Sequence, residues 1–381
     1  MSETYTLYGS HASYLTACSR SYLRKKGIPF VERLPAAPRF REHVRPSSGS
    51  HRIPQLETPD GEVIQDSTAI FDFLEARFPD PPAQPEGVRQ QLASRWCEVL
   101  IDAVLGMVAW HYRWNFMDEN YGFVGREFGR SFKPQGTDDE IDHYGRLIAD
   151  RMEGKRKAIG VTREHFPALE ALYFDVLDAL EAHFTRAPYL FGGLPSLADH
   201  VLMGPIFGHL ARDPLPAFLM KQRAPRVFRW AEAMNTPELQ APEFADFAPA
   251  WFPDDEIPET LAVFLRLLIS EAKPQLLETA RCFAEWVEAH PDHPAGTAIS
   301  EKMDEPSVGR FERDLRGTSL QTSAQAYSLW VLQRGFDWFD TLSAEDQEKG
   351  RAFLSSLGGE ALLEVRPARR LTRVNNFVAV A

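Results

Sequence analysis

Residues 51–78 constrain the fold of this chain most, because they combine two short strands, a tight turn and a capped helix. Residues 53–56 and 62–65 have the length and composition of strands. Between them, residues 58–61 (TPDG) predict a turn in which proline fixes one dihedral angle and glycine accepts a positive φ. A helix is expected to begin at residues 66–67, before apolar residues at helical spacing.

This stretch predicts a binding site made mostly of backbone. The Ile53–Pro54 bond opens a strand beside a turn and is a candidate for the cis form, which would leave the N–H and C=O of Ile53 for an extended peptide. Ser67 at a helix N-terminus suits a carboxylate, and Asp66 suits an ammonium group. A small peptide-like molecule with a free α-amino and α-carboxyl group would satisfy all three. Alternatively, Asp66 and Ser67 serve only as helix caps.

Composition excludes several classes of protein. A formal net charge of −12 over 381 residues argues against a general binder of nucleic acid or of anionic membranes. Cys18, Cys97 and Cys282 lie far apart without a CxxC pair, which argues against a disulfide framework or zinc site and suits a reducing compartment. The N-terminus lacks the features of a signal peptide, and no apolar run approaches the ~20 residues of a membrane span. We therefore expect a soluble cytoplasmic protein.

The N-terminal part predicts a thioredoxin-like order of elements, βαβ followed by ββα. Residues 4–8 and 29–34 read as strands, and the helix between them over residues 13–26 is ended by Gly27. Residues 35–50 predict a loop with room for one helical turn. The proline-rich residues 78–85 predict a linker, so the first domain is placed at residues 1–80.

The middle of the chain predicts an all-α domain over residues 86–250. Its last helices include one that begins with a capping box, in which Ser196 is the N-cap and Asp199 the third helical residue. The helices expected from apolar periodicity cover residues 88–116, 138–157, 166–184, 196–212 and 224–234.

Residues 251–381 predict a mostly helical extension of unknown role. A long helix is expected over residues 256–289 with a kink at Pro274, followed by a polar, irregular segment at residues 291–315. Two more helices (323–339 and 344–357) and a strand within 374–380 complete the expectation.

Four stretches of the chain resemble the cytosolic glutathione transferase superfamily, of the bacterial type but with a C-terminal extension. They are LYGSHASYLTACSR (7–20), IPQL (53–56), DSTAI (66–70) and PSLADHVL (195–202), in the family's order and over roughly residues 5–239. The resemblance implies a thioredoxin-like N-terminal domain, an all-α C-terminal domain, a homodimer and glutathione as co-substrate, without a metal.

On this resemblance, Ser13 falls at the position of the catalytic Ser or Cys. A hydroxyl at a helix N-terminus can donate to a thiolate, and the helix dipole favours the anion. Two residues are alternatives, because Tyr14 replaces the family's usual proline and Tyr8 lies close to where other branches place a catalytic tyrosine. Cys18 lies inside the helix and is expected to be buried and inert; otherwise the protein would be a thiol-disulfide exchanger.

The resemblance also implies how glutathione is bound. Its cysteinyl backbone would pair with Ile53 beside Pro54, its ammonium group with Asp66 and its glutamyl carboxylate with Ser67. Arg52 is a candidate for the glycyl carboxylate, although a solvated surface arginine is an equal alternative.

For the second substrate, Trp110 and Trp114 are candidates to line a hydrophobic pocket, although core packing explains them equally well. His290 and His293 resemble a loose metal pair without further ligands, so no metal is expected. The function expected is conjugation of the glutathione thiolate to a hydrophobic electrophile, in detoxification. The alternatives are a glutathione-dependent reductase, lyase or isomerase, or a non-catalytic binding or assembly module.

Overall fold

The computed structural model describes residues 4–154, 159–300 and 307–381. The chain divides into two compact units, each made of several segments. The first consists of Met1–Pro85, Ala109–Lys155 and Leu180–Phe252, and the second of Glu86–Val108, Arg156–Ala179 and Pro253–Ala381. The division into domains at residues 1–80, 86–250 and 251–381 stays a prediction.

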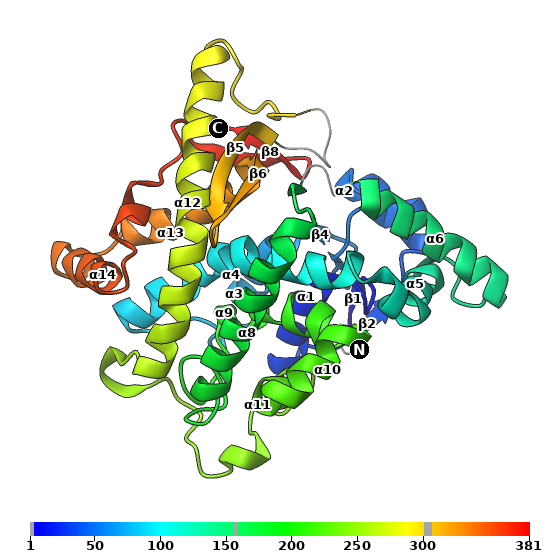
Figure 1. Cartoon of the computed structure of the whole chain (residues 1–381), viewed down its shortest axis with the longest axis horizontal. Helices are drawn as coiled ribbons and strands as arrows, with labels where there is room; N and C mark the ends of the chain where they lie inside the picture. Colours follow the sequence, from blue (N-terminus) through cyan, green and yellow to red (C-terminus); the bar gives the residue numbers. More distant parts are fainter. Residues whose placement is uncertain (1–3, 155–158, 301–306) are drawn as a thin grey trace. The chain divides into compact units, whose positions relative to one another are not determined.

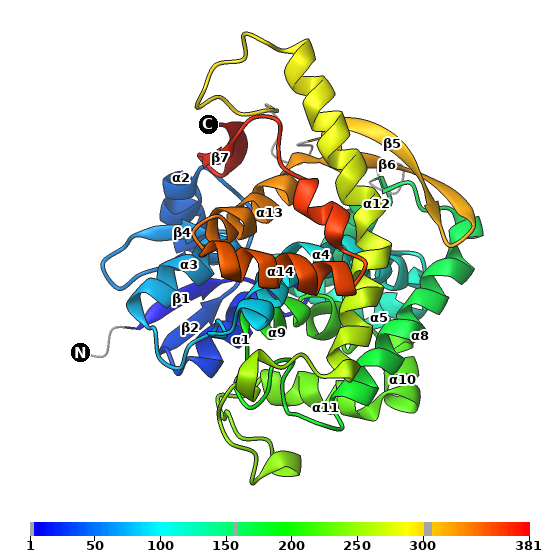
Figure 2. The same cartoon turned by 90° about the vertical axis from the view of Figure 1, so that its left-hand side faces the viewer.

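The first unit contains a four-stranded sheet in the order β2-β1-β3-β4 (blue in Figures 1 and 2). Strand β1 is parallel to β2, and β3 is antiparallel to both β1 and β4. Helix α1 follows β1 and helix α3 follows β4, which is the thioredoxin-like order that the sequence predicts. The bounds are β1 Tyr5–Tyr8, α1 Tyr14–Lys25, β2 Phe30–Arg33, β3 Gln55–Glu57, β4 Val63–Gln65 and α3 Ser67–Arg77.

Helices α1 and α3 pack against each other, and Tyr8 of β1 packs against the short helices that follow β2. The rings of Tyr22 in α1 and Phe71 in α3 lie 4.9 Å apart. Tyr8 instead packs with Phe40 and Val44, which belong to the short helices η1 (Phe40–Val44) and α2 (Arg45–Ser48). This segment was predicted as a loop with at most one turn. It is helical because its two buried apolar residues, four positions apart, face Tyr8 together.

The Ile53–Pro54 bond is cis, as predicted, and a second cis bond at Asp80–Pro81 was not anticipated. Strand β3 begins at Gln55 rather than at Ile53. The difference follows from Pro54, which has no N–H to donate to a strand ladder.

Helices form the rest of the first unit. They are the end of α4 (Val88–Trp114), α5 (Met117–Phe132), α6 (Asp138–Gly154), the end of α8 (Phe166–His183), α9 (Leu197–Leu202), η3 (Ile206–Leu210), α10 (Pro214–Arg223), α11 (Pro225–Met234) and η4 (Pro242–Phe244). Helices α5 and α10 were not predicted. In α5 the helical pattern is masked by glycines that allow close packing: a Cβ on Gly129 would lie 2.0 Å from the Ile141 carbonyl oxygen of α6.

The single helix predicted over residues 196–212 is in fact two, α9 and η3. The predicted capping box is present: Ser196 Oγ accepts from the Asp199 N–H at 3.3 Å, and Asp199 Oδ2 accepts from the Ser196 N–H at 2.9 Å. The interruption lies at Gly204 and Pro205. Proline supplies no N–H, and a Cβ on Gly204 would lie 2.6 Å from the Tyr14 ring.

The second unit contains the first parts of α4 and α8 and most of the C-terminal extension. Its remaining elements are η2 (Arg163–His165), η5 (Pro253–Asp255), α12 (Glu259–Ala289), β5 (Ser307–Leu315), β6 (Thr318–Gln325), α13 (Ala326–Phe339), α14 (Ala344–Ser356), η6 (Glu360–Glu364), β7 (Leu371–Val374) and β8 (Phe377–Val380). Helix α12 continues through Pro274, where a kink was expected. In the interior of the second unit, the rings of Trp96 in α4 and Phe336 in α13 pack 5.7 Å apart.

In this unit the structure differs from the sequence-based expectation mainly in its strands. The segment predicted as irregular, residues 291–315, ends in β5, which pairs with β6 in an antiparallel hairpin; residues 301–306 of it lie outside the described residues. The helix expected from residue 323 begins at Ala326, after β6. The predicted terminal strand is β8, joined to β7 by Asn375 and Asn376, both at positive φ (49° and 68°), as a two-residue hairpin turn requires.

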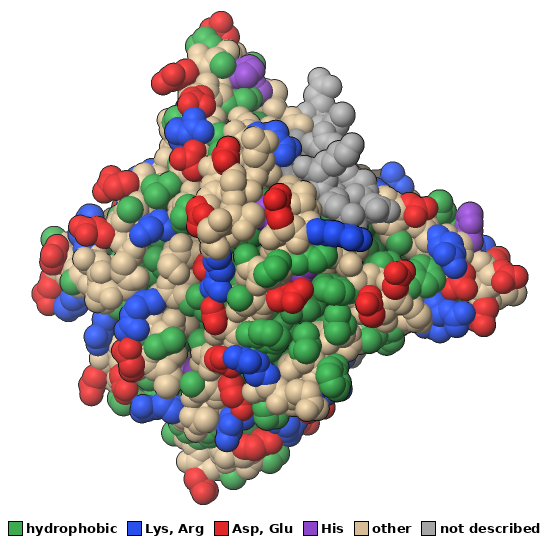
Figure 3. Space-filling model, in the orientation of Figure 1, with side chains coloured by type: hydrophobic (Ala, Val, Ile, Leu, Met, Phe, Trp, Pro, Cys, Tyr) green, Lys and Arg blue, Asp and Glu red, His purple; other side chains and the backbone are tan. Residues whose placement is uncertain are grey.

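Two surface properties bear on possible partners. On the face shown in Figure 3, acidic and basic side chains are interspersed. None of the helices in the described ranges is both long and apolar enough to cross a membrane.

Candidate functional site

Three of the predicted site segments meet at one edge of the sheet in the first unit. Tyr8 at the end of β1 pairs with Gln55 at the start of β3, and Gln55 pairs with Gln65 at the end of β4. The loop into α1, the Ile53–Pro54 peptide and the start of α3 therefore leave the sheet from the same row of residues. Two helix N-termini, each with a partial positive charge, begin at this edge.

Ser13 is the N-cap of α1 and is half-buried. Its extended backbone (φ −85°, ψ 124°) lets Oγ accept from the N–H of Thr16 at 3.3 Å. The hydroxyl proton has no acceptor among the described residues. It can therefore be donated to a group placed beyond the helix N-terminus, and a thiolate there would also gain from the helix dipole.

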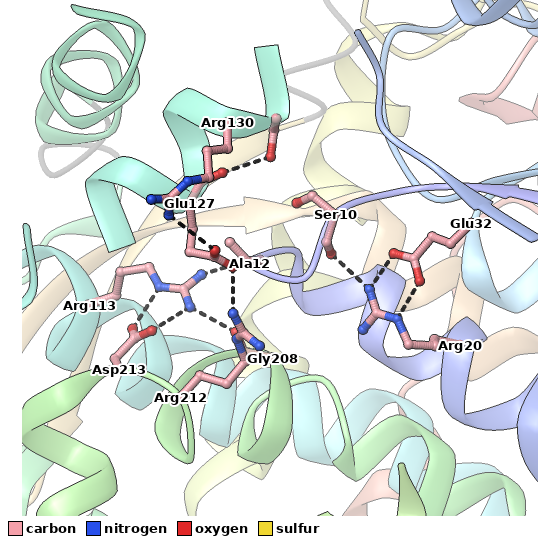
Figure 4. Close-up of polar contacts among 11 residues, drawn as sticks. Ser10, Ala12, Arg20, Glu32, Arg113, Glu127, Arg130, Gly208, Arg212 and Asp213 are labelled. Atoms are coloured by element: carbon pink, nitrogen blue, oxygen red, sulfur yellow. Dashed lines mark hydrogen bonds and ion pairs between the residues drawn. The ribbon is translucent and has the colours of Figure 1, made fainter. Parts of the chain in front are cut away.

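The loop before Ser13 is held from the side of β2. A Cβ on Gly9 would lie 2.1 Å from Thr16 Cγ2, so only glycine allows this close approach of loop and helix. The fully buried Arg20 donates to the Ser10 carbonyl at 3.1 Å and forms an ion pair with Glu32 at 2.6 Å (Figure 4).

A second buried guanidinium holds the same loop from the helical side. Arg113, near the end of α4, donates to the Ala12 carbonyl at 2.6 Å and pairs with Asp213 through two bonds of 2.7 Å (Figure 4). Arg113 was not predicted from the sequence. The available signal was a charged residue inside the aromatic run WHYRW.

The two alternative hydroxyls, of Tyr8 and Tyr14, are buried. Tyr8 is buried and donates to Glu57 at 2.9 Å, and burial, together with that carboxylate, raises its pKa to about 12. The Tyr14 hydroxyl oxygen is buried, and the Tyr14 ring packs 5.6 Å from the ring of His209 in η3. Neither arrangement favours donation to a thiolate.

Glu57 is bound from two sides. Besides the Tyr8 hydroxyl, it accepts from Arg39 Nε at 2.8 Å. Burial alone would raise the pKa of the Glu57 carboxyl, but the hydrogen bonds from Arg39 and Tyr8 outweigh it, so its pKa lies below the ordinary value.

The backbone of Ile53 is available as predicted. Among the described residues, its N–H and C=O make no hydrogen bond. The segment before it is fixed by Gln55, whose buried amide Nε2 donates to the carbonyls of Ser50 and Arg52, each at 2.8 Å. Gln55 is a second residue that the sequence analysis missed. The half-exposed Arg52 is placed immediately before Ile53.

Asp66 caps α3 and carries an unusual backbone conformation. Its Oδ1 accepts from the Thr68 N–H at 2.9 Å, and its own N–H donates to the Pro54 carbonyl at 3.2 Å. The φ of Asp66 is 88°. Residues other than glycine rarely adopt such a positive φ, and those that do are often found at functional sites. Ser67 follows as the first residue of α3, and its hydroxyl has no hydrogen-bond partner within the described ranges.

The two predicted pocket residues are mostly buried. Trp110 and Trp114 are each 7% exposed, and the Trp114 ring packs 5.5 Å from Phe128 of α5. Packing therefore accounts for most of their surface, and their contribution to a pocket stays a prediction.

Cys18 is buried, and His290 and His293 both pack against one tryptophan. The Cys18 thiol is buried, as predicted, and donates to the carbonyls of Tyr14 and Val201, each at 3.6 Å. His290 stacks on the ring of Trp286 at 4.5 Å, and His293 contacts the same ring at 4.9 Å. In the part of the chain that the structure describes, no three His, Cys, Asp or Glu side chains are grouped to hold a metal ion.

Two family models match segments of this chain. Residues 7–82 match the N-terminal domain of glutathione S-transferase, and residues 163–233 match its C-terminal domain. No curated protein sequence gives a significant match.

Solved structures similar to this chain include several glutathione transferases. One from Methylobacterium radiotolerans, in complex with glutathione sulfonate, is 20% identical, covers 65% of this chain and 96% of its own, and gives a TM-score of 0.36. The beta-etherase LigF from Sphingobium sp. strain SYK-6 is 18% identical over 64% and 97% of the two chains, with a TM-score of 0.41. The transferase GSTFuA3 from Phanerochaete chrysosporium is 18% identical over 63% and 100%, with a TM-score of 0.43.

The two matched segments contain most of the four-stranded sheet and the capping box of α9. Through these two domains, the chain belongs to the glutathione transferase superfamily.

Proposed function

We propose that this protein binds glutathione at the sheet edge formed by the ends of β1 and β4 and the start of β3, and that Ser13 activates the glutathione thiol. The observation that carries the proposal is the register of Tyr8, Gln55 and Gln65, because it brings two helix N-termini and a free strand-like peptide to one place. These are the groups that a tripeptide with a free α-amino and α-carboxyl group requires.

In this proposal the backbone of Ile53 pairs with the cysteinyl residue of glutathione. The Ser67 hydroxyl and the first N–H groups of α3 receive the glutamyl carboxylate, and Asp66 receives the ammonium group. Arg52 lies next to Ile53 and is proposed to meet the glycyl carboxylate. The backbone strain at Asp66 supports this assignment, since its φ of 88° persists at the residue that would contact the ligand.

Ser13 is proposed as the group that stabilises the thiolate, in preference to Tyr8 and Tyr14. Its proton is available, whereas the Tyr8 proton is held by Glu57. Stabilising the anion lowers the pKa of the bound thiol toward neutrality and raises the concentration of the nucleophile. The thiolate then attacks an apolar electrophile, forming a carbon–sulfur bond as the leaving group departs or a double bond accepts the electron pair.

We also propose that the protein is a homodimer, that it is located in the cytoplasm, and that the electrophile contacts Trp110 and Trp114. The buried Cys18 gives no support to the alternative of thiol-disulfide exchange.

Calorimetric titration of glutathione tests the proposed site. The wild type is expected to bind, and Ser67→Ala is expected to lose about 1.5–3 kcal/mol of binding free energy, the usual value of a hydrogen bond to a charged group. Ser94→Ala is the matched control, because Ser94 is also buried but belongs to the second unit, and it should bind as the wild type does. Absence of binding by the wild type would reject the proposal.

A further inference from the structure

The ion pair between Arg113 and Asp213 is buried inside the first unit, with each side chain 1% exposed. Arg113 Nε and Nη2 each donate to one carboxylate oxygen of Asp213 at 2.7 Å. Burial raises the pKa of the Asp213 carboxyl, and the Arg113 charge opposes this change. A bidentate pair of this kind fixes the plane of the guanidinium and leaves its remaining N–H groups aimed in set directions.

Those remaining N–H groups bind two backbone carbonyls from distant parts of the chain. Nη1 donates to Ala12, immediately before Ser13, at 2.6 Å, and Nη2 donates to Gly208 of η3 at 2.7 Å. Figure 4 shows the guanidinium between these carbonyls and Asp213.

Gly208 itself lies against the start of α1. A Cβ placed on it would lie 3.1 Å from the Tyr14 Cα and 3.3 Å from the Ser13 carbonyl oxygen. Arg113 therefore links Ala12, the residue before Ser13, to η3, which packs against the backbone of Ser13 and Tyr14. Since a buried ion pair is often no more stabilising than apolar residues of the same size, fold stability alone does not account for this arrangement.

We infer that Arg113, oriented by Asp213, is a positioning residue that fixes the backbone at Ala12 and thereby the direction of the Ser13 hydroxyl. This inference rests on the proposed function, in which that hydroxyl donates to the glutathione thiolate. Arg113 acts only through Ser13. It leaves the proposed glutathione-binding groups on Ile53 and Ser67 in place, because these lie just before β3 and just after β4.

The test uses the full-length protein with glutathione as the probe. The pKa of the bound thiol is measured from the ultraviolet absorbance of the thiolate against pH, and the glutathione Kd is measured by calorimetry. Arg113→Lys keeps the charge beside Asp213 but cannot supply a planar fork to three acceptors. We expect the thiolate fraction below the thiol's pKa to fall about tenfold, while Kd changes less than about twofold.

Three further variants make the result specific. Ser13→Ala should lower the thiolate fraction similarly, and the double variant Ser13→Ala/Arg113→Lys should lower it no further, since both residues act in one chain of contacts. Arg212→Lys is the matched control. Arg212 precedes Asp213 and pairs with Glu127, and no described hydrogen bond joins it to the loop before Ser13, so the control should behave as the wild type does.

If circular dichroism shows that Arg113→Lys is poorly folded, the variant Asp213→Asn is tested in its place. That variant keeps the shape of the pair and should lower the thiolate fraction in the same direction.

The contrary outcomes are distinct. If Ser13→Ala lowers the thiolate fraction and Arg113→Lys does not, or if Arg212→Lys has the same effect as Arg113→Lys, the positioning role is overturned and the proposed function stands. If the wild type does not bind glutathione, or if Ser13→Ala leaves the thiolate fraction unchanged, both are overturned.

Discussion

The starts of α1 and α3 are two helix N-termini at the same sheet edge, but they are held in different ways. The loop before α1 depends on a contact from far along the chain, because Arg113 binds the Ala12 carbonyl from 101 residues away, in addition to Arg20 at Ser10. The start of α3 depends on nearer residues, through the cap of Asp66 on Thr68 and the backbone bond to Pro54. The proposed reactive half of the site therefore needs a long-range contact that the proposed binding half does not need.

The largest expected effect is on the α1 side. Arg113→Met removes one partner of a buried ion pair and leaves Asp213 without its counter-charge, which typically costs about 3–5 kcal/mol. Denaturant unfolding monitored by tryptophan fluorescence measures this loss. The double variant Arg113→Met/Asp213→Leu should recover part of it, because no charge remains buried. A loss below about 1 kcal/mol for the single variant would contradict the strength assigned to these long-range contacts.

The second largest effect is expected from acid, which should lower the unfolding free energy through His209, beside the start of α1. Burial, with the charge of Arg113, holds the pKa of His209 well below its ordinary value, and its ring contacts Tyr14 at the start of α1. The unfolded chain therefore takes up this proton first as pH falls below about 6.5. The unfolding free energy should fall by up to about 1.4 kcal/mol per pH unit for this group.

Replacing His209 by phenylalanine separates this effect from general acid denaturation. His209→Phe keeps an aromatic ring against Tyr14 and should reduce the dependence of the unfolding free energy on pH between about 6.5 and 5. His290→Phe, at the exposed end of α12, is the matched control and should retain the wild-type dependence. Equal pH dependence in the wild type and His209→Phe would exclude His209 as the acid-sensitive group.

A smaller effect is expected at the start of α3. Asp66→Ala loses the cap and places alanine at a φ of 88°, so it should cost about 1 kcal/mol, within the usual 0.5–2 kcal/mol for caps. Asp66→Gly should cost only a few tenths, since glycine accepts this conformation. Thermal unfolding of the two variants gives the order. Glycine costing more than alanine would mean that the backbone strain at Asp66 is not significant.

The same contrast explains which parts of the fold could be predicted. The order of strands and helices along the N-terminal part, the start of α1 near Ser13 and the capping box at Ser196 follow from patterns of neighbouring residues, and they were predicted. Helix α5 and hairpin β5–β6 were not, because glycines mask the helical period in the first and the second has few apolar residues. The split between α9 and η3 depends on the Tyr14 ring at Gly204, which is distant in sequence.

The site divides in a similar way. The free backbone of Ile53 and the position of Ser67 follow from local patterns in residues 51–78. The role of Arg113 could not be read from the sequence, because the Ala12 carbonyl that it binds is 101 residues away in the chain. The role of Gln55 was missed although its partners, the carbonyls of Ser50 and Arg52, belong to the same segment. Asp66 does serve as a helix cap, which was the alternative to a binding role in the sequence-based prediction, and its binding role remains a proposal.

The most direct test of the account is the pKa of the thiol of glutathione bound to the wild type and to Ser13→Ala. The account predicts that the wild type holds this pKa well below that of free glutathione, and that Ser13→Ala returns it most of the way while glutathione remains bound. The same thiol pKa in both proteins, with glutathione bound to each, would contradict the assignment of Ser13 as the activating group.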